Sequence, residues 1–246
     1  MLRTNPPLLA ALTACALSMP VGAQENLVTL GAFVTVRTEN VPDFESAVRE
    51  HTTWHASQSD PQAWVAYQAV TGSGEYVILA PDMTWASLDG PIVDMGTDLA
   101  HWAKTGAHLV DTEEIVLWSQ LPNGNPPEDA TQYPVVQVLE FDINSGGNAA
   151  AMHAIEQASE ALSRTGLQFE WSTVVSADAS PSVFLALWFE NFEALGTPGP
   201  GADRIMADAF GPGQGARVLA DFSEATTAKS SQIWVMRPDL SYVPSM

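Results

Sequence analysis

The chain repeats one order of predicted elements, and this repeat constrains its fold more than any other feature. A series of strand, helix, strand, strand, helix and strand runs between residues 27 and 120, and the same series returns between residues 134 and 238. The matched positions, each 107 residues apart, are Val28 with Val135, Phe44 with Ala151, Glu75 with Ser182 and Trp85 with Phe192. A constant offset through four elements indicates that the chain contains two copies of one unit.

Local sequence signals set the boundaries of the first unit. Residues 28–37 are mostly β-branched and apolar, which favours a buried strand. Asn40 offers a helix N-cap and Pro42 an early helical proline, so we expect a helix from there to about Ser57. Further strands are predicted at residues 63–70, 75–81 and 114–119, the first two joined by a Gly-Ser-Gly hairpin at 72–74.

A second helix of the first unit is predicted at about residues 91–104. Its apolar face is formed by residues that recur at helical spacing, namely Ile92, Met95, Leu99 and Trp102. His101 and His108 would then lie on the opposite side of the helix. We therefore assign these two histidines to the solvated surface.

The second unit follows the same plan after a linker. Residues 121–133 are rich in proline, glycine and asparagine, which interrupt both helices and strands. A helical region broken by glycine and proline is predicted at 192–228, before the last strand. The other predicted elements are a helix at 148–164 and strands at 135–143, 168–176, 182–190 and 232–237.

Each unit has the ferredoxin-like order βαββαβ, in which both helices cover one face of an antiparallel sheet. The other face stays bare, and two such sheets can bury each other's bare faces. We therefore expect an α+β fold in which two tandem ferredoxin-like units form one barrel within a single chain. In this respect the chain resembles the dimeric α/β-barrel superfamily. Its members include antibiotic-biosynthesis-type monooxygenases, haem-degrading monooxygenases, chlorite-dismutase-like proteins and stress-response barrel proteins.

The resemblance covers nearly all of residues 27–238 and rests on the order of the elements. No signature motif of these families accompanies it, so the monooxygenase-like or haem-linked chemistry it implies is an analogy of fold. Nucleotide-binding and hydrolase motifs are missing from the sequence as well. The glycine-rich stretch at 211–215 follows no predicted strand and contains a proline, so it is interpreted as a loop.

The first 23 residues are typical of a cleaved secretory signal. Arg3 precedes an apolar stretch from Leu8 to about Leu17, and small residues stand just before Gln24, where signal peptidase would cut. The apolar stretch is shorter than the about 20 residues that span a bilayer. We therefore expect an exported protein, periplasmic or secreted, without a transmembrane segment.

Cys15 is the only cysteine and offers an alternative kind of leader. Leu12-Thr13-Ala14-Cys15 resembles the lipobox of bacterial lipoproteins, which would place a lipid anchor on Cys15. The residues after Cys15 stay apolar where a lipoprotein usually becomes polar, so ordinary cleavage is favoured. That cleavage would remove the cysteine, and with it any disulfide, thiolate nucleophile or cysteine metal ligand.

The charge of the chain limits its partners. It has 29 acidic against 9 basic residues, a formal net charge of −20. Such a surface repels phosphate backbones, so we expect no nucleic acid partner. Hydrophobic residues make up 46% of the chain, which is typical of a folded globule. A monomer with pseudo-dimeric halves and a homodimer both agree with this pattern.

Two histidines of the first predicted helix are candidates for chemistry. Phe44, Ala47 and Val48 form its apolar stripe, and His51 and His55 extend that stripe. Two imidazoles four residues apart can hold a transition metal, and one can act as a general base or haem ligand. Buried histidines bonded to backbone carbonyls remain the alternative. Haem, a transition metal and no cofactor all stay open, and His153 receives no role.

Five of the eight tryptophans fall in predicted strands. Aromatic side chains facing the barrel interior would form an apolar pocket for a small hydrophobic or aromatic molecule, although simple core filling is the alternative. The alternation of a strand places Trp171 and Glu170 on opposite faces but does not tell which face lines the barrel. The candidates for ligand binding are Trp64, Trp118, Trp171, Trp188 and Trp234.

The second unit offers no counterpart of the histidine pair. At the offset of 107, Ala158 stands opposite His51 and Leu162 opposite His55. The sequence therefore predicts that any chemistry is asymmetric and belongs to the first unit. The function expected is binding or transforming a small apolar molecule, with a non-catalytic envelope binding or interaction protein as the alternative.

Overall fold

The computed structural model describes residues 27–71, 74–89, 95–175 and 181–244. The predicted export signal at 1–23, together with Cys15, lies outside the described residues. The same holds for the predicted hairpin tip at 72–73 and for the start of the predicted second helix at 91–94. Among the helices that are described, none is both long and apolar enough to cross a membrane.

Eight antiparallel strands form the centre of the molecule. They are β1 (Val28–Val36), β2 (Val65–Ala69), β3 (Glu75–Met83), β4 (Val110–Gln120), β5 (Val135–Ile143), β6 (Gln168–Val174), β7 (Ser182–Phe189) and β8 (Thr226–Met236). They close into a barrel in the order β1-β3-β2-β8-β5-β7-β6-β4. The predicted α+β class with an antiparallel barrel is confirmed.

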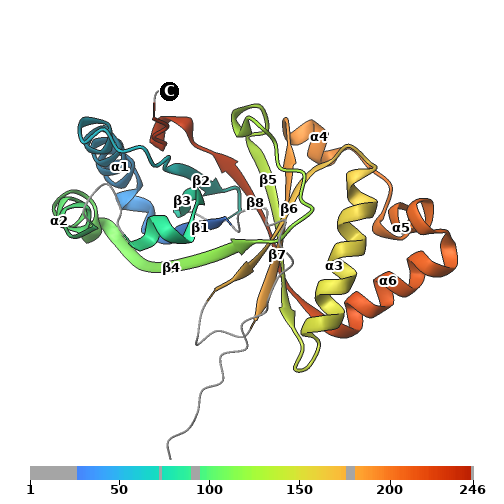
Figure 1. Cartoon of the computed structure of the whole chain (residues 1–246). Coiled ribbons are helices and arrows are strands. Elements are labelled where there is room, and N and C mark those ends of the chain that lie inside the picture. Colours follow the sequence, from blue (N-terminus) through green and yellow to red (C-terminus); the bar gives the residue numbers. More distant parts are fainter. Residues whose placement is uncertain (1–26, 72–73, 90–94, 176–180, 245–246) are drawn as a thin grey trace, which may run out of the picture.

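The helices lie outside this barrel. They are α1 (Val41–Ser57), α2 (Met95–Thr105), α3 (Asn148–Ser163), α4 (Phe192–Gly196), α5 (Ala202–Phe210) and α6 (Pro212–Ala225). Figure 1 shows α1 and α2 on one side of the barrel and α3, α5 and α6 on the opposite side. Each half of the chain thus covers the outer face of its own strands.

The two halves of the chain meet along two short seams. At one seam β2 pairs with β8, from Tyr67 opposite Met236 to Ala69 opposite Trp234. At the other seam β4 pairs with β6, beginning with Trp118 opposite Val174. Each seam holds three residue pairs, whereas β1 and β4 within the first half pair along nearly their whole lengths.

Alternation along the strands separates the barrel interior from the layers under the helices. On β6, Phe169 and Trp171 pack into the buried cluster beneath α3, whereas Glu170 and Ser172 border the interior. On β3, Tyr76 packs with Phe44 under α1, and its neighbour Val77 belongs to the interior cluster. Every strand therefore presents one face to a helix layer and the other to the interior.

The 107-residue spacing holds at all four positions for which it was predicted, including the starts of α1 and α3 and of the segments at Trp85 and Phe192. Strand β5 begins 107 residues after β1, and β7 begins 107 residues after β3. The last strands of the two halves, predicted outside this spacing, start 116 residues apart because α5 and α6 precede β8. Consequently β8 starts at Thr226 and is longer than the predicted strand at 232–237. Strand β4 likewise begins at Val110 rather than at residue 114.

The segment between the halves is packed against the barrel. The backbone N–H of Leu121 donates to the carbonyl of Trp171, and Asn125 exchanges backbone hydrogen bonds with Phe169 at 2.7 and 2.9 Å. The side chain of Asn125 also donates to the carbonyl of Leu167. These contacts fix the first part of the predicted linker along β6.

Candidate functional site

The barrel interior holds a cavity of about 1040 Å³. Small-molecule sites commonly occupy about 300–1,000 Å³ and are lined by apolar and aromatic groups. Strands of both halves contribute to the wall, because the seams bring their inward-facing residues together. Its aromatic residues are Phe33, Tyr67, Trp118, Phe184, Trp188 and Trp234.

Three of the five predicted ligand-binding tryptophans line this cavity, namely Trp118, Trp188 and Trp234. Trp171 has the opposite parity on β6, so its ring packs with Phe141 and Phe222 on the outer side of the sheet. Trp64 precedes β2 and donates its Nε1–H to Asp60 at 3.0 Å. The structure thus brings three of these tryptophans together and places the other two elsewhere.

The indole of Trp118 lies over Gly31 of β1. A Cβ atom at Gly31 would stand 2.2 Å from Cζ3 and 2.5 Å from Cη2 of that ring. Glycine is therefore what allows the ring to lie against the barrel wall. The Nε1 of Trp118 is buried and has no hydrogen-bond partner among the described residues.

Glu170 lies in the cavity wall and has a strongly raised pKa. It lies on β6 beside Ala186 of β7, both facing the cavity. Burial, with a smaller contribution from the charge of Asp82, raises the pKa of Glu170 to about 7. No cation among the described residues contacts its carboxyl group. At neutral pH this acid is therefore divided between its protonated and ionised forms and can accept or release a proton.

Tyr67 complements Glu170 in the same wall. Burial is the main cause that raises the pKa of Tyr67, and the negative charge of Glu170 adds to it, whereas a hydrogen bond with Trp188 opposes it. The phenol therefore stays protonated and can donate a hydrogen bond. Sequence reasoning missed both residues. The sequence did hold a signal for Glu170, which is an acidic residue between the apolar Phe169 and Trp171 of one predicted strand. That signal could not be used, because the sequence does not tell which face of the strand lines the barrel interior.

One part of the cavity wall is polar and paired. Glu140 accepts hydrogen bonds from Lys229 at 2.9 Å and from Ser230 at 3.1 Å. Asp142 accepts from the hydroxyl of Ser182 at 3.0 Å. Lys229 is half exposed, so this part of the wall reaches solvent. Its carboxylates have partners, which distinguishes them from Glu170.

The predicted histidine pair forms a second cluster, on the outside of the barrel between α1 and α2. Nε2 of His51 lies 3.3 Å from Nε2 of His55, as their spacing on α1 requires. Oδ1 of Asp98, in the first turn of α2, lies 3.0 Å from Nε2 of His51 and 3.6 Å from Nε2 of His55. His55 is 2% exposed, so the prediction that it extends the buried stripe of α1 is confirmed.

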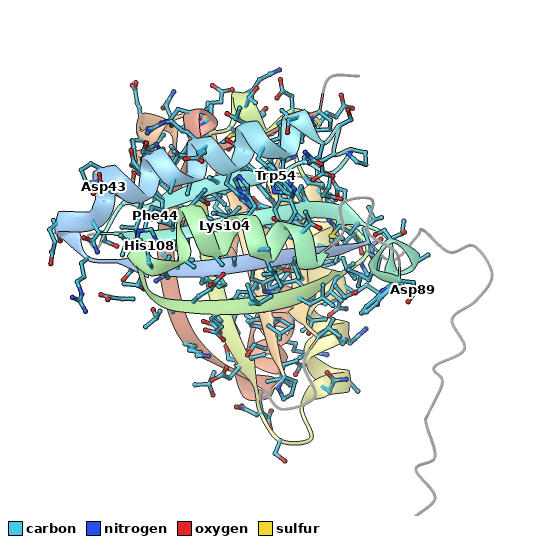
Figure 2. The ribbon with its side chains drawn as sticks, turned by 90° about the vertical axis from the view of Figure 1, so that its left-hand side faces the viewer. Asp43, Phe44, Trp54, Asp89, Lys104 and His108 are labelled. Carbon is cyan, nitrogen blue, oxygen red and sulfur yellow. The ribbon has the colours of Figure 1, made fainter. Side chains whose placement is uncertain are left out.

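Helix α2 agrees with the predicted faces at Trp102, which packs against the core cluster under α1, and contradicts them at Leu99 and His101. Leu99, expected on the buried face, is 58% exposed. His101, expected at the surface, instead places its Nδ1 2.9 Å from Nδ1 of His51 and stacks on Trp54. Figure 2 looks onto α1 and α2, with Trp54 where the two helices face each other. The inward face of α2 is mostly polar because it meets the histidine cluster, whereas His108 is exposed as predicted.

Carboxylates and aromatic rings hold the cluster in place. Nδ1 of His55 lies 2.8 Å from Oδ2 of Asp60, and Asp60 also accepts from the backbone N–H of Gln62. Burial, followed by the nearby His51, lowers the pKa of His55. Burial likewise lowers the pKa of His101. Both imidazoles are therefore neutral at neutral pH, the form that offers a lone pair.

The histidines do not fit a haem ligand in the cavity. All five histidines are described, and none of them lines the interior cavity. His55 is buried, with Nδ1 held by Asp60 and Nε2 facing His51 and Asp98, so a haem iron finds no open approach to it. His153 stands on α3 and is 68% exposed. The cavity wall therefore offers a haem no axial histidine.

The cavity and the cluster lie on opposite sides of the sheet. Strand β3 separates them, since Tyr76 packs under α1 and Val77 faces the interior. His51 and His55 therefore cannot act as a base on a molecule held by the interior tryptophans. The sequence-based hypothesis had joined these residues in a single site.

Comparisons with known proteins relate the fold of this chain to others. A proposed monooxygenase from Lactobacillus acidophilus NCFM matches with a TM-score of 0.59 and 8% identity, over 90% of this chain and 98% of that one. An anthrone oxidase-like protein matches at 0.57 and 9% identity, over 87% and 92%. A mutant chlorite dismutase from Candidatus Nitrospira defluvii matches at 0.53 and 10% identity, over 86% and 92%. No family profile and no curated protein matches the sequence. These likenesses support the dimeric α/β-barrel fold.

Proposed function

We propose that the protein binds a small apolar or aromatic molecule inside the barrel and removes a proton from it with Glu170. The observation that carries this proposal is a carboxyl group in the wall of a cavity of about 1040 Å³, with a pKa of about 7 and no ionic partner among the residues that the structure describes. A base whose pKa lies near neutrality is well matched to proton transfer at that pH. The aromatic rings around it would hold the substrate.

The proton moves from an acidic C–H or O–H of the bound molecule to an oxygen of Glu170, and the bonding electrons stay on the substrate. Tyr67, whose phenol lines the cavity, can donate a hydrogen bond to the anion that forms. A monooxygenase-like reaction would begin with this step. The names of two fold neighbours, a proposed monooxygenase and an anthrone oxidase-like protein, agree with this class of chemistry.

Ligand titration tests the binding part of the proposal. We expect 1-naphthol, an aromatic phenol, to change the tryptophan fluorescence of the protein on binding. The variant Trp188→Phe should lose part of that change, whereas Trp171→Phe, which removes a ring outside the cavity, should keep it. Filling the cavity with Ala186→Trp should abolish binding in a folded protein. Binding that survives in folded Ala186→Trp would contradict a site in the interior.

A second measurement separates an enzyme from a binding protein. If Glu170 acts as a base, the wild-type protein should catalyse exchange of the acidic α-C–H protons of bound 2-tetralone, an aromatic ketone, for deuterium in D2O, which NMR spectroscopy detects, and Glu170→Gln should not. Binding of 2-tetralone to the wild type without exchange would favour the non-catalytic alternative.

We also propose that the halves are tandem ferredoxin-like units, at 27–120 and 134–238, joined by the segment 121–133. Their strand orders support this, since β4-β1-β3-β2 in the first half corresponds to β8-β5-β7-β6 in the second. The common spacing of β1 with β5 and of β3 with β7 adds to it. An experimental structure in which the halves superpose about a pseudo-two-fold axis would test it.

Export remains a proposal based on the N-terminal sequence. The apolar stretch after Arg3 and the small residues before Gln24 support cleavage there. The intact mass of protein from the native cell envelope tests this. A chain beginning near Gln24 is expected, and a diacylglyceryl group on Cys15 would contradict it.

A further inference from the structure

Three potential ligand atoms converge between α1 and α2. Nε2 of His51, Nε2 of His55 and Oδ1 of Asp98 all lie within 4.8 Å of one another, at separations of 3.0, 3.3 and 3.6 Å. Oδ1 of Asp98 is buried and accepts no hydrogen bond among the described residues. A carboxylate oxygen in that state lacks a partner that a cation would provide.

The separations match the coordination shell of zinc. With Zn–N bonds of about 2.0–2.1 Å, the ligand atoms of a tetrahedron lie about 3.3 Å apart. The three observed separations of 3.0, 3.3 and 3.6 Å are distributed around that value. We propose that His51, His55 and Asp98 bind a zinc-type divalent transition-metal ion, with a fourth position left for water or another ligand. This site is independent of the function proposed for the barrel cavity.

Asp60 and His101 contact the Nδ1 atoms of His55 and His51. These contacts direct the Nε2 lone pairs of both histidines toward the space between α1 and α2. Asp60 can only accept hydrogen bonds as a carboxylate, so the 2.8 Å contact puts the proton of neutral His55 on Nδ1. Nε2 of His55 is then unprotonated and faces the cluster. Metal-binding histidines commonly donate their other ring N–H to a carboxylate in this way. His101 stands in the equivalent place behind His51, at 2.9 Å between the Nδ1 atoms.

Without a metal ion, hydrogen bonds alone do not give every polar atom of the cluster a partner. The proton of His51 can lie on Nε2 and be shared with His55, while Nδ1 of His51 accepts a hydrogen bond from His101. Nε2 of His51 also lies 3.0 Å from Oδ1 of Asp98, but its one proton cannot be directed at both atoms, and this oxygen accepts no hydrogen bond among the described residues. With a metal, His51 donates from Nδ1 to His101, and all three inner atoms bind the ion. A metal ion would therefore contact all three atoms at once, which a single shared proton does not.

Zinc binding to the chelator-treated full-length chain tests the site directly. We expect equilibrium dialysis to give one Zn²⁺ per chain, and Co²⁺ in its place to show the intense visible absorption of a tetrahedral site. Asp98→Asn and the double variant His51→Ala, His55→Leu, which introduces the residues of the second half, should lose that stoichiometric binding. Asp60→Asn should weaken the affinity about 10–100-fold, because it removes only the group behind His55.

The controls are His108→Gln and His153→Gln, which remove exposed histidines and should bind zinc as the wild type does. Circular dichroism establishes that each variant is folded. If a variant at His51, His55 or Asp98 fails to fold, the number of zinc ions bound per wild-type chain still tests the proposal. A wild-type chain that binds no zinc overturns it. Zinc retained by a folded double variant also overturns it. Loss of zinc should leave 1-naphthol binding unchanged, which separates this result from the test of the cavity.

Discussion

At the scale of single residues, the two candidate sites share one property. Each contains a polar group that has no hydrogen-bond or ionic partner in the described part of the chain. Inside the barrel these are the carboxyl group of Glu170 and Nε1 of Trp118, and between the helices it is Oδ1 of Asp98. Burying such a group without a partner costs about 1–3 kcal/mol, which an ordinary apolar residue would avoid. Nε1 of Trp171, in the core beneath α3, is likewise buried without a partner, so such an atom points to a site only where other evidence, such as converging ligand atoms or a cavity, accompanies it.

Replacing Glu170 with glutamine should change how stability depends on pH. The pKa of Glu170 is about 7 in the folded protein, against 4.5 for an unperturbed glutamate, so the folded state binds the proton more tightly. The wild type therefore loses stability relative to Glu170→Gln as pH rises from 4.5 to 7, and the difference levels off above 7. It should reach about 3 kcal/mol. Urea unfolding of both proteins at pH 5 and pH 8 measures it, and an equal difference at both values would contradict the raised pKa.

Adding a methyl group at Gly31 should disturb the cavity wall. In Gly31→Ala the new Cβ would clash with the ring of Trp118, 2.2 Å away, so the ring must move. We expect a loss of about 1–3 kcal/mol in the free energy of unfolding and weaker binding of 1-naphthol. Gly196→Ala is the matched control, because nothing lies within 4 Å of its added atom. Equal stability of Gly31→Ala and wild type would show that Trp118 moves freely.

At the scale of elements, sequence patterns predicted the order of strands and helices better than the face that each one buries. Helix α1 has a conventional apolar stripe, so the burial of His55 followed from periodicity. In α2 the inward face is Asp98, His101, Trp102 and Thr105, which recur at helical spacing but are mostly polar. A hydrophobic pattern cannot identify a face whose partners are other polar groups. For the same reason the inward orientation of Glu170 required the strand pairings.

A charged network fastens α1 to the end of β8. Arg237 donates to Glu45 of α1 at 2.6 Å, to Gln68 of β2 at 2.7 Å and to Asp239 at 2.9 Å. The hydrogen bond from Arg237 is the main cause that lowers the pKa of Glu45, and Arg237 likewise lowers the pKa of Asp239. Ionised carboxylates therefore hold the helix against the seam between the halves.

Removing the guanidinium with Arg237→Met should lower the free energy of unfolding by about 2 kcal/mol at pH 7. The carboxylates have lowered pKa values when folded, so the stabilisation is present at neutral pH and is lost as pH falls below their ordinary values near 4. The difference between variant and wild type should shrink accordingly. Arg204→Met, which removes an exposed ion pair with Asp208, should change stability by less than about 0.5 kcal/mol. A pH-independent difference would indicate lost packing instead.

At the scale of the whole molecule, both halves contribute to one interior cluster. Tyr67 and Trp118 come from the first half, and Val136 and Trp234 come from the second. Neither half can bury these side chains without the other. The short seams therefore join parts that are already held together by a common core.

This common core predicts that the protein unfolds in one cooperative step. Calorimetry should give equal calorimetric and van't Hoff enthalpies, and the near- and far-ultraviolet circular dichroism should change at the same temperature. Zinc bound between α1 and α2 would shift that single transition as a whole. Two separate transitions would mean that the halves fold independently.

Closing the barrel within one polypeptide also changes what mutation can do to it. In a barrel assembled from two identical subunits, every substitution appears twice, so a polar cluster useful on one side must be tolerated on the other. Here a single gene encodes both sides, and each codon affects only one of them. His51 and His55 could therefore arise in one half while Ala158 and Leu162 kept the other half apolar. Because one chain contains both halves, a mutation in one half leaves the other half unchanged, and the two halves can acquire different residues.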